Sequence, residues 1–259
     1  MSRPKVGFLI TARLKSSRLP KKVILDIAGK PAIVHQLDRI KQAKHIDKIV
    51  ICTSTNPQDD PLVEIARQEG VECYRGSEED VLSRLLKSAQ EHDLDYFVNI
   101  TADCPLIDPK FIDQIAKTLH STDADLVRMT RLPLGQGPNG VRVGALQKIC
   151  LIKTETETEV WGKYFSESGE FRLYDLDVPE QYCHAALKTS LDYPEDYEFL
   201  KRIFAELGAS GNLFSLTAVI DLVNRKPELL EINGHCAALG KKHIARTSTP
   251  VKFRQKERV

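Results

Sequence analysis

The stretch VGFLITARLKSSRLPKK, residues 6–22, joins a short apolar run to a strongly basic loop. The run VGFLITA is typical of a buried β-strand. The formal net charge of the whole chain is only +1, yet five cations follow that run within ten residues: Arg13, Lys15, Arg18, Lys21 and Lys22. Such a cluster repels itself unless an anion lies nearby. The stretch therefore predicts a strand whose following loop binds a negatively charged ligand.

Strand patterns and helix patterns alternate along the first half of the chain. Apolar runs that favour strands continue at 47–55, 71–75, 95–100 and 124–130. Helical spacing of apolar residues occurs at 31–43, 60–70, 77–92 and 109–119. This order is typical of βαβ units with a mainly parallel sheet and helices on both of its faces. We therefore expect an α/β fold with three layers, αβα, in a single domain.

The alternation is less regular after residue 132. The Gly- and Pro-rich segment 132–142 predicts a loop, and the polar segment 154–177 predicts a helix followed by a hairpin or an excursion from the core. A strand is expected at 184–191, then a helix to residue 207 and another at 216–232. We expect one domain over residues 1–240, with a small excursion at about 135–183, and a loosely ordered basic tail at 241–259.

The composition restricts the classes of partner. With 37 basic and 36 acidic residues, the chain has no general attraction for nucleic acid or for a membrane surface. No apolar stretch approaches the roughly 20 residues that span a bilayer, and the start MSRPKVGF lacks a signal-peptide core. The six cysteines are scattered without a C-x-x-C pair, which argues against a zinc site and a disulfide scaffold. We expect a cytoplasmic protein with reduced thiols and without a nucleic-acid or membrane partner.

The basic loop follows a strand, which is where open α/β sheets bind their ligands. Arginine can bind a phosphate through two parallel hydrogen bonds, lysine supplies a point charge, and the backbone N–H groups of Ser16 and Ser17 would add donors. The Walker and Rossmann glycine motifs are absent, so P-loop hydrolases and dinucleotide enzymes fit poorly. The loop therefore favours a polyphosphate ligand. A solvated basic loop without a ligand is the alternative.

Two aspartates follow predicted strands at their carboxyl ends. Asp103 follows the strand at 95–100, and Asp192 follows the one at 184–191. Two carboxylates brought together repel each other unless a cation lies between them, and Mg²⁺ prefers one or two carboxylates together with phosphate oxygens. Asp103 and Asp192 are therefore predicted to hold Mg²⁺ beside the basic loop. A turn or helix-cap role is the alternative for each of them.

Several segments together resemble a known family. They are ARLKSSRLPKK (12–22), DIAGKP (26–31), TSTNPQDDPLVEIA (53–66), RGSEEDVLSR (75–84), ITADCPLIDP (100–109) and SLDYPEDYEFLKRIF (190–204). Over roughly residues 5–204 the chain resembles the sugar cytidylyltransferases, which include acylneuraminate and ketodeoxyoctonate cytidylyltransferases, and most of all their spore-coat-polysaccharide branch. The resemblance implies a glycosyltransferase-A-like nucleotide-diphospho-sugar transferase fold for the domain, CTP as donor, Mg²⁺ as cofactor and often a homodimer.

The same resemblance implies roles for individual residues. Arg13 and Lys22 would face the triphosphate with Arg18 close by, and Asp103 and Asp192 match acidic metal ligands. Ser77 and Asp80 would lie near the base and ribose, although a simple capping box explains them equally well. The predicted catalytic residues are Arg13, Arg18, Lys22 and Asp103. The predicted nucleotide-binding residues are Ala12, Arg13, Ser16, Ser17, Lys22, Ser77 and Asp80.

One segment departs from the spore-coat branch. In PNGVRVGAL, residues 138–146, Arg142 and Gly144 stand where that branch has carboxylates. Arg142 is predicted to bind a carboxylate or phosphate of the substrate, with a plain surface arginine as the alternative. The predicted function is transfer of CMP from CTP to an acidic or amino sugar, with release of pyrophosphate, for a surface glycan. The alternatives are a transferase that uses another nucleotide, GTP first, and a catalytically weakened nucleotide- or sugar-binding protein.

Overall fold

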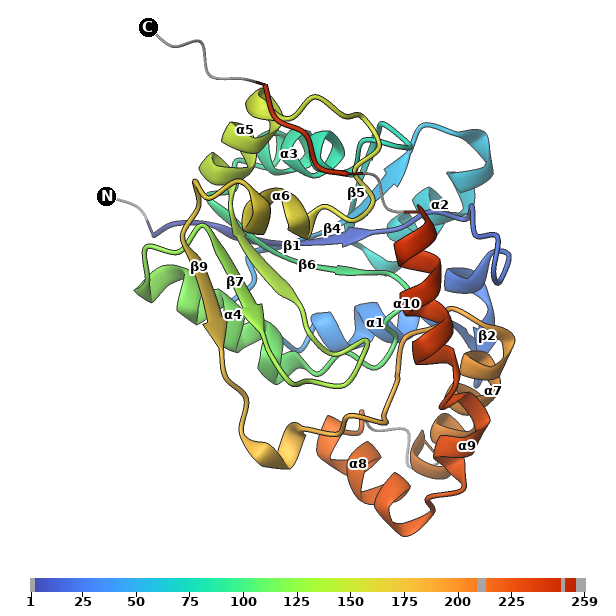
Figure 1. Cartoon of the computed structure of the whole chain (residues 1–259). Coiled ribbons are helices and arrows are strands. Elements are labelled where there is room, and N and C mark those ends of the chain that lie inside the picture. The colour runs from blue at the N-terminus through green and yellow to red at the C-terminus, as the bar shows by residue number, and fades with distance from the viewer. Residues whose placement is uncertain (1–2, 209–212, 248–249, 255–259) are drawn as a thin grey trace, which may run out of the picture.

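A seven-stranded sheet forms the centre of the molecule (Figure 1). The computed structural model describes residues 3–208, 213–247 and 250–254 of the chain. In spatial order the strands are β5 (Glu72–Gly76), β4 (Lys48–Ser54), β1 (Val6–Thr11), β6 (Tyr96–Thr101), β8 (Asn139–Arg142), β7 (Leu126–Met129) and β9 (Leu173–Leu176). Only β8 is antiparallel to its neighbours. The mainly parallel sheet predicted from the sequence is confirmed.

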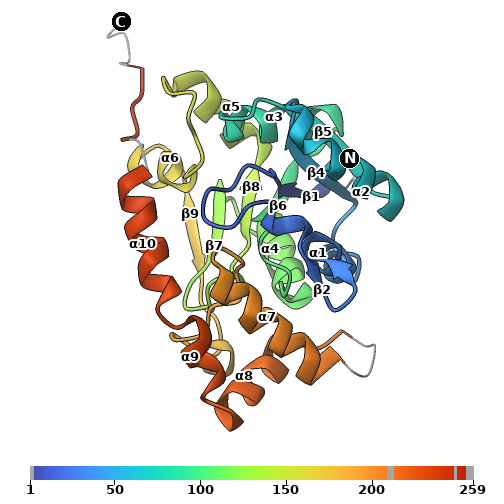
Figure 2. The same ribbon diagram turned by 90° about the vertical axis from the view of Figure 1, so that its right-hand side faces the viewer.

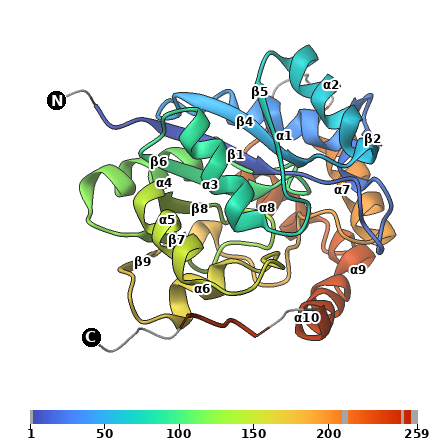
Figure 3. The same ribbon diagram turned by 90° about the horizontal axis from the view of Figure 1, so that it is seen from above.

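Helices cover both faces of this sheet (Figure 3). On one face lie α1 (Ala32–Ile40), α2 (Asp60–Glu69) and α4 (Pro109–Ser121), and on the other lie α3 (Val81–Glu91), α5 (Val143–Ile152) and α6 (Gly162–Glu167). Alternate β1 residues explain the arrangement, because Phe8 packs into the first cluster and Leu9 into the second. The three-layer αβα fold in one domain is confirmed.

A third group of helices lies at the edge where the parallel strands end (Figure 2). Its members are α7 (Pro194–Leu207), α8 (Leu216–Arg225), α9 (Leu229–Asn233) and α10 (Cys236–Thr247). The buried side chains of α7 and α8, among them Phe199 and Val223, form a cluster of their own. The described residues also form a short hairpin, β2 (Asp26–Ile27) with β3 (Lys30–Pro31), and the 3-10 turns η1 (Lys22–Ile24), η2 (Pro57–Asp59) and η3 (Glu180–Tyr182). None of the described helices is long and apolar enough to cross a membrane.

The second half differs from the prediction in three places. Residues 184–191 do not form a strand, and only Lys188 makes an isolated bridge, to Leu134. The helix expected at 216–232 is two helices, because Pro227 has no backbone N–H and α8 ends before it. The segment 154–177 contains the expected helix, α6, but β9 joins the main sheet parallel to β7 and forms no hairpin.

The predicted loose tail also differs in its described part. Residues 241–247 complete α10, whose helix begins at Cys236. Further on, the Arg254 N–H donates to the carbonyl of Ile152 over 2.7 Å, and the Phe253 ring packs edge-on against Tyr164. Residues 248–249 and 255–259 lie outside the described residues. The described end of the tail, at Phe253 and Arg254, therefore packs against α5 and α6.

Candidate functional site

The base of the basic loop is fixed by a buried carboxylate. Asp59, in η2, is fully buried and accepts a hydrogen bond from the Leu14 N–H at 2.8 Å. Its second oxygen accepts one from the Ser54 hydroxyl at 2.5 Å, at the end of β4. Two neighbouring strand ends therefore hold the start of the loop, which leaves its cations in a defined place at the carboxyl edge of the sheet.

The far end of the loop turns Lys22 into the site. Lys21 adopts a left-handed conformation with φ of 55°, an uncommon geometry for a residue with a side chain, and the turn η1 begins directly after it. The Lys22 ammonium donates to Asp192 Oδ1 at 2.8 Å and also to Asp103 Oδ2. The Arg18 guanidinium donates to the same oxygen of Asp192 at 2.7 Å. Cations and carboxylates that are distant in the sequence thus converge on one point.

These contacts shift the ionisation of the groups concerned. Burial opposes the charged form of Lys22, but Asp103 and Asp192 outweigh it and raise the pKa of this lysine above its usual value. Burial likewise opposes the charged form of Asp192, but Lys22, Lys188 and Arg18 hold the pKa of its carboxyl well below the usual range. Burial, with the nearby charge of Asp103, raises the pKa of the Cys104 thiol well above its ordinary value. Cys104 is therefore a protonated, packed side chain and a poor nucleophile.

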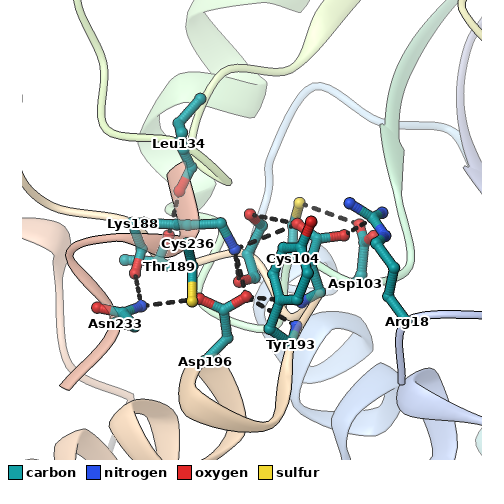
Figure 4. Close-up of polar contacts among 12 residues, drawn as sticks. Arg18, Asp103, Cys104, Leu134, Lys188, Thr189, Tyr193, Asp196, Asn233 and Cys236 are labelled. Atoms are coloured by element: carbon teal, nitrogen blue, oxygen red, sulfur yellow. Dashed lines mark hydrogen bonds and ion pairs between the residues drawn. The ribbon is translucent and has the colours of Figure 1, made fainter. Parts of the chain in front are cut away.

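A second carboxylate, Asp196, holds the Asp192 loop in place (Figure 4). It is fully buried, receives the Lys188 ammonium at 2.5 Å, and accepts from the backbone N–H of Asp192 at 2.9 Å and of Tyr193 at 3.0 Å. Asn233 donates to its other oxygen at 2.9 Å. The sequence reasoning missed Asp196, although its place three residues after Tyr193, which precedes Pro194 and the helix, is the signature of a helix-capping acid.

Three adjoining cavities surround the cluster, and Arg18, Thr101 and Asp103 line all of them. The smallest, about 120 Å³, lies along the basic loop and reaches Arg13 and Lys22. A second, about 250 Å³, extends between the 157–164 segment and α10. The third, about 530 Å³, extends from Asp103 and Asp192 toward Asn99, Asn139 and the inner side of α10. There is room for a ligand on either side of the carboxylate pair.

Arg13 is paired with carboxylates in this structure. Its guanidinium lies 3.3 Å from Glu159 and 3.7 Å from Glu79, and it donates to the carbonyl of Glu78 at 2.8 Å. Lys15 similarly lies 3.0 Å from Glu79. Both acids are exposed or half-exposed, so the ion pairs are screened by solvent and individually weak. An anionic ligand with several charges can therefore displace them.

Ser77 and Asp80 have local structural partners. Ser77 Oγ accepts from the N–H of Asp80 at 3.0 Å, and Asp80 Oδ1 caps α3 by accepting from the N–H of Ser83 at 3.1 Å. The Asp80 carboxylate also receives the Lys153 ammonium at 2.6 Å and the Thr158 hydroxyl at 3.0 Å. Both of its oxygens are therefore occupied. This geometry favours the capping alternative for the pair and ties the 153–158 segment to α3.

The remaining nucleotide-binding candidates lie on or beside the loop. Ala12 is buried at the end of β1, where its N–H donates to Cys52 O at 3.2 Å. Ser16 is half-buried, with Leu19 N donating to its hydroxyl at 3.4 Å, and Ser17 is exposed. The fully buried Arg84, which the sequence reasoning missed, donates to the carbonyl of Glu78 at 3.1 Å and also to that of Ser77. In the sequence, Arg84 is visible only as an arginine within the apolar face of the helix α3, which does not indicate a role in a site.

Arg142 lies far from this cluster, at the other end of the sheet. It pairs with Tyr96, the first residue of β6, whereas Asp103 follows the last residue of that strand. The length of β6 separates the two by roughly 17 Å at the usual rise per residue. The Arg142 guanidinium lies over the Tyr96 ring and 3.6 Å from Asp125. This placement favours the alternative of a plain surface arginine for Arg142.

The carboxylate pair fits a divalent cation. Oxygens of Asp103 and Asp192 both contact the single nitrogen of Lys22, so the two groups are close enough to share one cation. Their side chains keep 16% and 15% of their surface exposed, on the wall of the 530 Å³ cavity. Two hard oxygen donors with open positions for phosphate and water are what Mg²⁺ requires. Asp103 and Asp192 would be its protein ligands.

The comparisons with known proteins agree with this geometry. The sequence profile described as "Cytidylyltransferase" matches residues 8–207. The chain is 27% identical over 228 residues to the spore coat polysaccharide biosynthesis protein SpsF of Bacillus subtilis, covering 85% of this chain and 95% of that protein. It is 32% identical over 165 residues to the 3-deoxy-manno-octulosonate cytidylyltransferase of Geobacter sulfurreducens, covering 62% and 61%.

A solved structure shows the same architecture. The cytidylyltransferase of Leptospira borgpetersenii superposes with a TM-score of 0.80 at 27% identity, covering 88% of this chain and 97% of that one. The fold and the site together define a nucleotidyltransferase with the expected nucleotide-diphospho-sugar transferase fold. The chain belongs to the cytidylyltransferase family, and its relatives include sugar cytidylyltransferases.

Proposed function

We propose that the protein transfers CMP from CTP to an acidic sugar and releases pyrophosphate, with Mg²⁺ as cofactor, for the synthesis of a surface glycan. The observation that carries the proposal is the convergence of Lys22 and Arg18 on the paired carboxylates of Asp103 and Asp192. Positive groups there can meet phosphate oxygens, and the carboxylates can meet a metal. Family membership supports CTP as the donor.

The nucleotide would occupy the two cavities beside the basic loop. Arg13 and Lys22 line the smaller one, and Arg18 lines both. When Glu79 and Glu159 are displaced from Arg13, its guanidinium would be free to bind the triphosphate. The short 77–79 segment and α3 would then lie at the far side of the nucleotide from the carboxylate pair.

The reaction follows from the charges. An oxygen of the sugar attacks the α-phosphorus, a new P–O bond forms, and the bond to the β-phosphate oxygen breaks, so that pyrophosphate leaves. Negative charge grows on the oxygens around the α-phosphorus and on the leaving pyrophosphate. Lys22, Arg18 and Arg13 would stabilise this charge once the ligand and the metal take the place of their present carboxylate partners. Mg²⁺ bound to Asp103 and Asp192 would supply further charge neutralisation on the phosphate oxygens.

The acceptor would occupy the 530 Å³ cavity, beyond the carboxylate pair. Its wall offers the polar side chains of Asn99, Asn139 and Ser190 together with Lys241 on α10. No ion-pair partner of Lys241 occurs within residues 3–208, 213–247 and 250–254, so its ammonium is available to an anion. A carboxylate-bearing sugar fits this wall better than a neutral one.

The experiment is pyrophosphate release by the purified protein with Mg²⁺, testing CTP, GTP, UTP and ATP against a panel of nonulosonic acids and sugar phosphates. We expect release with CTP and one acidic sugar. Pyrophosphate release with GTP in place of CTP would leave the proposed mechanism intact but change the proposed nucleotide specificity. Binding of CTP without release across the panel would favour a sugar- or nucleotide-binding protein. The proposed homodimer and cytoplasmic location are tested separately, by light scattering and by fractionation of cells.

A further inference from the structure

We propose that Glu195, His235 and Cys236 form a second metal site, one that binds a transition-metal ion such as Zn²⁺ and links α7 to α10. Glu195 lies in the first turn of α7, and His235 and Cys236 stand at the start of α10. Their carboxylate, ring nitrogen and sulfur atoms all lie within 4.8 Å of one another. This site is separate from the carboxylate pair that the proposed function assigns to Mg²⁺.

The separations between these atoms are close to those of donors that share one metal ion. His235 Nε2 lies 3.7 Å from Glu195 Oε1 and 3.8 Å from Cys236 Sγ. The first distance is too long for an N–H···O hydrogen bond. In a tetrahedral zinc site with ordinary bond lengths, the nitrogen lies about 3.4 Å from a carboxylate oxygen and about 3.6 Å from a thiolate sulfur. Movements of a few tenths of an ångström would bring the His235 nitrogen to these separations from the other two atoms, and a water would take the fourth position.

The types of donor select the class of ion. One thiolate, one imidazole and one carboxylate suit Zn²⁺ and related transition metals, while Mg²⁺ avoids sulfur. The carboxylate pair Asp103 and Asp192 offers oxygen only, so the two sites would bind different ions. In the metal-free state, burial and the nearby acids Asp196 and Glu195 raise the pKa of the Cys236 thiol to about 11. Metal binding therefore displaces a proton from the sulfur.

The proposed metal site lies close to the cavity that α10 lines. Cys236 is fully buried beside the Asp196 network, which holds the Asp192 loop (Figure 4). Within the next two turns of α10, Ala237, Gly240 and Lys241 line the 530 Å³ cavity. A metal that ties Glu195 to the start of α10 would fix this wall relative to the carboxylate pair. The spacing of cysteines in the sequence could not show this site, because Glu195 comes from a different helix.

The test is a Co²⁺ titration of the full-length protein after treatment with a chelator. We expect one equivalent to bind with a sulfur-to-cobalt charge-transfer band in the near ultraviolet, and Zn²⁺ to remove that band. Cys236→Ser should abolish the band. His235→Ala and Glu195→Gln should weaken Co²⁺ binding by at least about tenfold, the loss caused by removing even a supporting residue of a metal ligand.

Two controls separate this site from others. Cys183→Ser removes a half-buried thiol elsewhere and should leave the band unchanged, as should Asp103→Asn in the other site. Zn²⁺ should raise the thermal midpoint of the original protein, while that of Cys236→Ser should not respond. Absence of a thiolate–cobalt band in the original protein, or its persistence in Cys236→Ser, would overturn the proposal. Neither outcome depends on catalytic activity, so the result stands apart from that of the proposed function.

Discussion

The Lys22 ammonium donates to Asp192 Oδ1 at 2.8 Å although 170 positions separate the two residues in the chain. The same nitrogen contacts Asp103, so one lysine neutralises two carboxylates that would otherwise repel each other. A metal ion held by these carboxylates would take over that task and leave Lys22 to the phosphates. The contact therefore explains why a lysine and two aspartates occupy one point of the cavity.

Replacing Lys22 with a neutral residue removes a positive charge that would stabilise the transition state. Lys22→Gln should lower the rate of pyrophosphate release by about 10²–10³-fold, the loss typical of one fixed group that stabilises transition-state charge. Lys21→Gln is the matched control, because Lys21 precedes it, is exposed and lines none of the three cavities. Initial rates with saturating CTP and acceptor measure the difference. Equal rates for the two variants would remove Lys22 from the catalytic residues.

The lowered pKa of Asp192 predicts a dependence of stability on acid. Its ionised form stabilises the fold fully above the ordinary aspartate pKa of about 3.9, and this contribution is lost as the pH falls below that value toward the lowered pKa. Asp192→Asn should therefore show a smaller loss of stability between about pH 5 and pH 3 than the original protein. Urea midpoints at each pH measure it.

Asp221→Asn is the control for this loss of stability in acid. Asp221 is exposed on α8, and its carboxylate makes no ion pair within the described ranges. This variant should keep the acid dependence of the original protein. If Asp192→Asn lost stability with acid as steeply as the original, the contacts of Asp192 with Lys22 and Arg18 would not set its pKa.

Glu159 competes with the nucleotide for Arg13. Its carboxylate lies 3.3 Å from the Arg13 guanidinium and lines the cavities assigned to the nucleotide. Glu159→Gln should therefore tighten CTP binding by about two- to fivefold, consistent with a solvent-exposed ion pair. Glu167→Gln on α6 makes the same change of net charge at an exposed position that lines none of the three cavities. Calorimetric titration of both variants measures the effect, and equal affinities would contradict it.

A substitution at Gly240 can narrow the cavity assigned to the acceptor without disturbing the core. A Cβ atom built on it meets nothing within 4 Å, and the residue lines the 530 Å³ cavity. Gly240→Leu should raise the KM for the acceptor by about tenfold or more while the affinity for CTP stays unchanged. A bulky side chain there occupies space that the acceptor needs.

Gly144→Leu is the matched control for that experiment. Gly144 also lies within a helix, α5, and a Cβ there also meets nothing within 4 Å, but it lines none of the three cavities. Both substitutions improve helix propensity equally. A rise in acceptor KM in both variants, or in neither, would contradict the assignment of this cavity to the acceptor.

The sequence predicted those parts of the fold in which local pattern and tertiary role agree. The strands up to residue 130 are short apolar runs between helices with one apolar face, and their order along the chain follows from that alternation. The strand predicted at 184–191 does not form, because the apolar residues of this segment pack with those of α7 and α8 and no strand among the described residues pairs with it. Pro227 was a visible signal that the helix at 216–232 would break.

The site was predictable where it follows strand ends and hidden where it depends on folding of distant segments. Asp103 and the basic loop are adjacent to strands whose position the pattern defines. The prediction for Arg142 came from its place in a segment that departs from the spore-coat branch, but β8 runs antiparallel to β6 and carries Arg142 to the opposite end of the sheet. Local spacing could mark Asp196 only as a helix-capping acid, because its contact with Asn233 and the place of α10 on the cavity wall depend on separate helices.

The most direct test of the account is calorimetric titration of CTP into the protein, with and without Mg²⁺, for the original chain and for Asp103→Asn. The account predicts that CTP binds more tightly with Mg²⁺ than without, and more tightly than ATP. In Asp103→Asn the enhancement by Mg²⁺ should disappear while the circular dichroism spectrum is unchanged. Binding that is indifferent to Mg²⁺ and to Asp103, or no binding of any nucleotide, would contradict the metal–triphosphate site.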